Sequence, residues 1–95
     1  MKRIETKNAP SPIGPYSQAV ISGNTLYISG QVAINPETGK MEQDDLQSET
    51  HRVMQNLKGI LESQGLDFSN LIKCSIFLLD MDAFGQVNEV YGSYF

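Results

Sequence analysis

Cysteine is almost absent from this 95-residue sequence, which contains Cys74 alone. A single thiol can form no disulfide within the chain and no cysteine-rich metal site, so a reducing compartment fits best and we expect a cytoplasmic location. Histidine is equally scarce, with His51 as its one example. Because protein metal sites combine several histidine, cysteine or carboxylate ligands at suitable spacing, we predict no metal site.

Positive charge is also limited, with seven lysines and arginines against eleven acidic residues and a formal net charge of −4. This balance disfavours nonspecific attraction to nucleic acid or to an anionic membrane. The N-terminus carries Lys2, Arg3 and Lys7 but has no apolar signal-peptide core, and no window approaches the length of a membrane span. We therefore expect neither a nucleic-acid partner nor a membrane partner.

Motifs for nucleotide binding and for nucleophilic catalysis are missing as well. The sequence has no glycine-rich phosphate loop of either common type. His51 is expected on a helix and Cys74 on the apolar face of a strand. We therefore do not favour these two residues as a catalytic cysteine–histidine pair. For Cys74, a small buried core residue is the favoured interpretation, because it alternates with Ile72 and Ile76. For His51, a solvated position on the helix is favoured in the same way over a catalytic role.

The pattern that is present begins with strands. A short strand is predicted near Lys2 to Thr6, followed by a proline-rich approach to a longer one. Residues 17–22 and 25–31 contain β-branched and aromatic side chains on either side of Gly23-Asn24. This dipeptide predicts a β-hairpin with a type II′ turn.

A long amphipathic helix is predicted over residues 46–64. Its apolar and semi-apolar positions recur at steps of three and four residues, namely Leu46, Thr50, Val53, Leu57, Ile60 and Leu61. Acidic residues, including Asp44 and Asp45, precede it and suit the positive end of a helix dipole. Gly65 is the natural stop after the last turn.

A further strand is predicted over residues 71–79, with two different faces. One face contains Ile72, Cys74 and Ile76 and should meet the helices, whereas the mixed opposite face, which includes Phe77, suggests partial cover by another subunit. Asp80 or Asp82 then caps a second helix whose apolar side chains lie largely on one side: Phe84, Val87, Tyr91, Tyr94 and Phe95.

The predicted element order is that of an α+β sandwich with both helices on one face. A crossover of this kind predicts another strand after the last helix. Because the apolar helix pattern runs up to Phe95 with no C-cap, we expect residues 1–95 to form a single domain that is incomplete at its C-terminus, with C-terminal strands missing.

Three stretches resemble the RidA (YjgF) family. Residues 9–19, APSPIGPYSQA, resemble the family's N-terminal signature. Residues 26–31, LYISGQ, are similar to its second hairpin strand, and residues 87–91, VNEVY, to its second helix. The intervening lengths also match, so the resemblance extends over all 95 residues.

The resemblance implies a chorismate-mutase-like (YjgF-type) sandwich with a mixed sheet, two helices on one face and clefts between the subunits of a homotrimer. It implies hydrolytic deamination of enamines and imines of the 2-aminoacrylate and 2-iminopropanoate type to 2-keto acids and ammonia, with no cofactor. The activity implied is that of a 2-iminobutanoate/2-iminopropanoate deaminase acting on a small imine, enamine or keto-acid ligand. A noncatalytic trimeric ligand-binding or regulatory member of the family is the alternative, and an RNA-directed nuclease or translation inhibitor is disfavoured by the acidic balance.

The resemblance also implies site residues. Tyr16 would assist proton transfer as the catalytic residue, although a tyrosine covering a turn is the structural alternative. Ser29 would bind substrate through its hydroxyl, and Gly30 through its N–H, although a serine and glycine are also ordinary at a strand end. Asn88 would bridge a subunit boundary or line the cleft, although it could simply be a polar residue at a boundary.

Relatives are expected to carry, after the second helix, an arginine that grips the substrate carboxylate and a glutamate that positions water. Neither lies within residues 1–95. A bidentate arginine is a strong carboxylate anchor, so we expect the 95-residue chain by itself to have little deaminase activity.

Overall fold

A computed structural model describes all residues from Met1 to Phe95. Its sheet has three antiparallel strands in the order β1 (Lys2–Ile4), β2 (Ala19–Ser22) and β3 (Thr25–Ile28). The helices are α1 (Leu46–Ser63) and α2 (Phe84–Gly92), with short 3-10 turns η1 (Phe68–Asn70) and η2 (Met81–Ala83) before α2. The predicted α+β class is thus confirmed.

The β2–β3 hairpin turns at the predicted dipeptide. Ser22 pairs with Thr25 across Gly23 and Asn24. Gly23 has a φ of +60°, whereas no residue other than glycine has a positive φ. A positive φ at the first turn position alone is the signature of a type II′ turn, so the predicted turn is confirmed. Both strands are shorter than predicted: β2 begins at Ala19 and β3 ends at Ile28, while their ends beside the turn lie where predicted.

Helix α1 begins and ends where local signals predict. The Asp45 carboxylate accepts a hydrogen bond from the Ser48 N–H at 2.7 Å, which caps the helix and lowers the pKa of Asp45. After Ser63, Gln64 is the C-cap and Gly65 lies one position beyond it. The cap and the stop therefore match the expectation from sequence.

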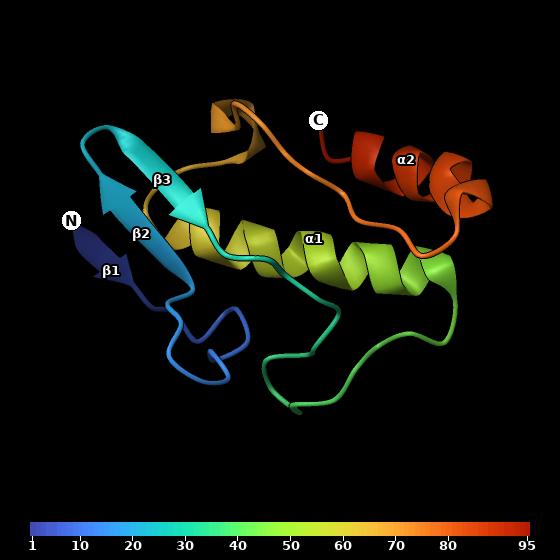
Figure 1. The fold of residues 1–95 in the computed structure, drawn as a ribbon, viewed down its shortest axis with the longest axis horizontal. Coiled ribbons are helices and arrows are strands. Elements are labelled where there is room, and N and C mark those ends of the chain that lie inside the picture. The colour runs from blue at the N-terminus through green and yellow to red at the C-terminus, as the bar shows by residue number, and fades with distance from the viewer.

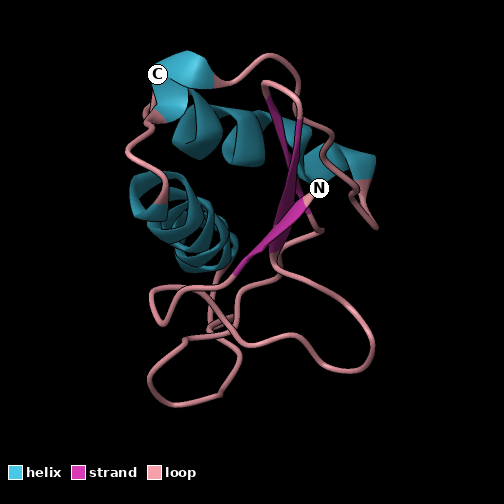
Figure 2. Ribbon diagram, turned by 90° about the vertical axis from the view of Figure 1, so that its left-hand side faces the viewer, coloured by secondary structure: helices cyan, strands magenta, loops and turns pink.

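The core forms where the second half of α1 crosses the sheet. Ile60 is fully buried and clusters with Ile4, Ala9 and Ala19. Figure 1 shows the sheet beside this half of α1 and α2 beside the first half, and Figure 2 shows the strands nearly edge-on with α1 along one side. Neither helix combines the length and apolar character that crossing a bilayer requires.

The predicted strand at 71–79 does not form. The segment carries no strand pairing, and Figure 1 shows it crossing from η1 to α2 without a neighbouring arrow. Its side chains are strongly exposed, with Ile72 at 90% and Phe77 at 94%. The predicted packing of Ile72 and Cys74 against the helices as one buried strand face is therefore wrong for this chain: both side chains are exposed, although Cys74 lies near Tyr91 of α2. A strand requires a paired neighbour, and residues 1–95 supply none here.

Candidate functional site

A pocket of about 300 Å³ lies where the hairpin opens at the end opposite its turn. One wall is the proline-rich segment before β2, and the other is the segment that follows β3; both leave the same end of the hairpin in Figure 1. Tyr16, Ser29 and Gly30 all line this pocket. The structure thus brings together three of the four residues that the sequence suggested.

Tyr16 sits on the wall that precedes β2. Its side chain is 69% exposed, and its ring lies against Gly14. The Tyr16 N–H donates to the Gly14 carbonyl at 2.9 Å, which forms a tight turn and holds the tyrosine backbone. No protein group accepts or donates a hydrogen bond at its phenol oxygen, so the hydroxyl is available to a ligand or water.

The opposite wall offers hydrogen-bonding groups from the backbone. Ser29 N–H donates to Gln18 O at 3.0 Å, and the Ser29 hydroxyl donates to Ser17 O at 2.5 Å, which ties the two walls together. Beyond this point the N–H groups of Gly30, Gln31 and Val32 have no acceptor within the chain. Unpaired N–H groups lining a pocket can bind a carboxylate or a developing negative charge.

Gln18 holds the first wall from inside the molecule. Only 4% of Gln18 is exposed. Its amide oxygen accepts from Thr6 N–H at 2.6 Å, and its amide nitrogen lies 2.9–3.1 Å from the carbonyl oxygens of Thr6, Ala9 and Pro10. No role for Gln18 follows from the sequence pattern, although it lies within the stretch that resembles the family signature.

Asn56 holds the second wall from α1. It is completely buried, and its amide nitrogen donates to Val32 O at 3.0 Å and to Ile34 O at 2.9 Å. Both acceptors belong to residues that line the pocket. Sequence reasoning missed Asn56; the available signal was a polar residue among the apolar positions Val53, Leu57 and Ile60 of the helix stripe.

Asn88 is not part of this pocket. It is exposed on α2, which packs against the first half of α1 rather than against the pocket walls. Hydrogen bonds run from Gln47 of α1 to Gln86 of α2 at 3.4 Å, and from Gln55 of α1 to the hydroxyl of Tyr94, just after α2, at 3.2 Å. Within one chain, the fourth predicted site residue thus lies apart from the other three.

Cys74 and His51 are both exposed and have different neighbours. The interaction of the Tyr91 phenol with the nearby Cys74 side chain, together with burial of the tyrosine, raises the pKa of Tyr91. His51 Nδ1 lies 2.8 Å from the Tyr94 hydroxyl. Burial of Cys74 in the core was therefore a wrong prediction, whereas the solvated position of His51 is confirmed. No three His, Cys, Asp or Glu side chains are grouped as metal ligands would be.

Comparison with known proteins places these features in a family. The family model described as endoribonuclease L-PSP matches residues 6–95. A mouse protein named 2-iminobutanoate/2-iminopropanoate deaminase is 46% identical over 94 residues, which is 99% of this chain and 70% of the mouse protein. Crystal structures of the YjgF gene product and of TdcF with bound serine, both from E. coli, each have a TM-score of 0.94 and 38% identity, covering 100% of this chain and 74% of theirs.

Proposed function

Because the chain belongs to the endoribonuclease L-PSP family, which includes the RidA and YjgF proteins, we propose that it hydrolyses small enamines and imines to 2-keto acids and ammonia. The substrates would be of the 2-aminoacrylate and 2-iminopropanoate type. The observation that carries the proposal is the pocket in which Tyr16 faces the free N–H groups that follow Ser29. The name of the mouse relative, 2-iminobutanoate/2-iminopropanoate deaminase, supports the same chemistry.

The proposed reaction needs little from the protein beyond orientation and proton transfer. A protonated imine is already electrophilic, so water adds to its carbon and gives a carbinolamine. Proton transfer from oxygen to nitrogen then allows the C–N bond to break, which releases ammonia and leaves the ketone of the 2-keto acid. Tyr16 would relay a proton, while Ser29 and the Gly30 N–H would orient the substrate. This scheme uses no cofactor.

The proposal includes a homotrimer in which a second copy contributes Asn88 to the pocket. Within one chain Asn88 is exposed on α2, away from Tyr16. The exposed apolar side chains of residues 71–79 provide a surface that another copy could cover. A cleft at a subunit boundary would then combine Tyr16, Ser29 and Gly30 of one copy with Asn88 of the next.

A noncatalytic ligand-binding role is the second candidate. The solved structure of TdcF with bound serine supports it, because that relative holds a small amino acid. In this case the pocket would retain a small carboxylate through the N–H groups of residues 30–32 without turning it over.

The test is ammonia release while 2-aminoacrylate is generated in place by a pyridoxal-phosphate enzyme acting on serine. The 95-residue chain would be compared with a chimera that appends the part of the mouse deaminase following its matched region. We expect the chimera to release ammonia well above the uncatalysed rate, and the 95-residue chain to do so weakly. A folded trimeric chimera that binds a keto acid but releases no extra ammonia would favour the ligand-binding role.

A further inference from the structure

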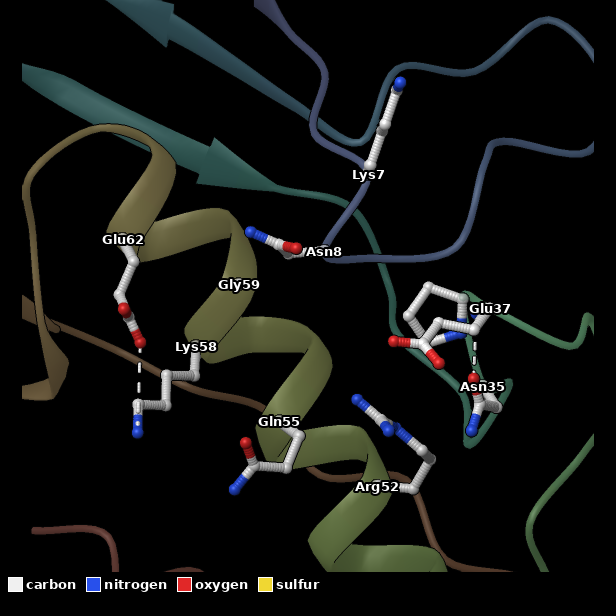
Figure 3. Close-up of a pocket in the computed structure, with 10 residues that line it drawn as sticks. Lys7, Asn8, Asn35, Glu37, Arg52, Gln55, Lys58, Gly59 and Glu62 are labelled. Carbon is white, nitrogen blue, oxygen red and sulfur yellow. Dashed lines mark hydrogen bonds and ion pairs between the residues drawn. The ribbon is translucent and has the colours of Figure 1, made fainter.

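A second pocket, of about 370 Å³, shares no lining residue with the Tyr16 pocket. Three parts of the chain meet there: the turn at residues 7–8, the turn at residues 35–37 and the outer face of α1 (Figure 3). No hydrophobic residue lines it. A pocket of this size with a predominantly polar lining is suited to a small polar ligand rather than an apolar one.

The pocket walls are held in place by specific contacts. Gly59 of α1 lets the Asn8 backbone lie directly against the helix, because a Cβ at this position would collide with the Asn8 carbonyl. On the other side, the Asn35 side-chain oxygen accepts from the N–H of Glu37 at 2.8 Å, and its nitrogen donates to Glu42 at 2.5 Å. The turn that carries Glu37 is therefore braced before any ligand arrives.

Arg52 is the unsatisfied group in this pocket. Its Nε is covered from solvent and has no hydrogen-bond acceptor, and the guanidinium forms no ion pair within the chain. Lys58, in contrast, lies 3.9 Å from Glu62 at the exposed rim. Figure 3 shows Arg52 and Glu37 facing the same space between α1 and the turn. A guanidinium whose covered Nε has no acceptor favours an anion beside it, because a planar guanidinium matches a carboxylate.

We propose that this pocket binds a small zwitterion of the α-amino acid type, with the carboxylate on Arg52 and the ammonium on Glu37. The charges of Arg52 and Glu37 are opposite, lie on separate walls and are not paired with each other, whereas Lys58 and Glu62 of the same lining pair at the rim. An inorganic phosphate dianion suits the pocket less well, because Glu37 would repel it. This site is independent of the proposed deaminase activity.

The test is an NMR titration of the ¹⁵N-labelled 95-residue chain with glycine, sodium acetate or inorganic phosphate. We expect glycine to cause saturable shifts, at millimolar concentration, of the amide signals of Asn8, Glu37, Arg52 and Gly59. Acetate should bind more weakly at the same signals, because it lacks the ammonium group. Tighter binding of phosphate than of glycine would overturn the assignment.

Matched variants separate the two charged contacts. Arg52→Gln should weaken glycine binding at least tenfold, whereas Glu37→Gln, on an exposed turn, should weaken glycine binding without weakening acetate binding. Arg3→Gln removes a cation from exposed β1, outside the pocket, and should change neither. Circular dichroism would establish that each variant is folded. Unchanged glycine binding in both pocket variants, or shifts confined to signals around Tyr16 and Gly30, would refute the proposed site.

Discussion

The Tyr16 hydroxyl has no partner within the chain and is exposed at the pocket mouth, so its removal should affect chemistry more than folding. For Tyr16→Phe in the active form, we expect turnover to fall about 10²-fold, the scale of one lost proton-transfer group, with little change in melting temperature. Ammonia release and thermal unfolding would be measured together.

Tyr27→Phe is the matched control for this substitution. Tyr27 is similarly exposed, at 62%, and lies outside the pocket, so turnover should be unchanged. Equal losses of melting temperature and turnover in Tyr16→Phe would instead support a structural role in covering the turn.

Asn56 is the residue whose loss should cost the most stability. Asn56→Ala leaves the Val32 and Ile34 carbonyls without their donor and opens a cavity, so we expect a loss of about 2–4 kcal/mol in unfolding free energy. Urea unfolding would measure it. The exposed neighbour Gln55, changed to alanine, should cost far less. A small loss at Asn56 would mean that residues 32–34 hold their position without it.

At the scale of elements, α1 depends on a close contact at Gly59. In Gly59→Ala the new methyl group would collide with the Asn8 backbone, so we expect about 1–3 kcal/mol of destabilisation, the usual cost of overpacking. Gly85→Ala in α2 meets no atom within 4 Å and should stabilise the protein by up to about 1 kcal/mol through helix propensity. Chemical denaturation of both variants would test the contrast, and equal effects would argue against the Asn8 contact.

The cap of α1 should make stability depend on acid. The Ser48 N–H bond holds the pKa of Asp45 below its ordinary value in the folded chain. The stabilisation from Asp45 is therefore present above the unfolded pKa of about 3.9 and is lost as the pH falls through the lower folded pKa. Urea unfolding between pH 7 and pH 2.5 would measure this loss.

Asp45→Asn keeps an oxygen acceptor but does not titrate, so its stability should fall less than that of the unaltered chain over this pH range. Asp67, whose pKa is also lowered, through its bonds with Ser69, contributes in the same direction and remains in both proteins. Asp44→Asn, beside the cap, is the control and should behave like the unaltered chain. Identical acid dependence in Asp45→Asn would contradict the cap as its source.

At the scale of the whole molecule, the exposed segment 71–79 is the surface on which we predict assembly into a trimer. Phe77→Asp should prevent assembly, because a charge placed in a subunit boundary loses its hydration without gaining a partner. Light scattering at micromolar concentration would measure the mass of both proteins.

Cys74 offers an independent measurement of the same surface, since its thiol is exposed in the single chain. Thiol labelling should be slower in the assembled protein than in Phe77→Asp if another copy covers this segment. A monomeric unaltered chain would contradict the predicted trimer. An unchanged mass for Phe77→Asp would mean that assembly uses another surface.

Local patterns in the sequence determined the helix α1 and the β2–β3 hairpin. Their signals are contained within a few residues: the Asp45 cap, the position of Gly65 and the Gly23-Asn24 turn. The signature around Tyr16 and the stretch around Ser29 likewise indicated three residues that line one pocket. The helix and hairpin predictions succeeded because short-range geometry sets a cap or turn. The three residues line one pocket because pairing at the open end of the hairpin brings its two flanking segments together.

Only the tertiary structure decided the features that depend on distant partners. Alternation over residues 71–79 indicated a strand, but a strand exists only with a paired neighbour, and Cys74 is exposed for that reason. The roles of Gln18 and Asn56 depend on which carbonyl groups the fold brings opposite their amides. Arg52 and Glu37 lie 15 positions apart in the sequence and face one pocket only because a turn folds back over α1.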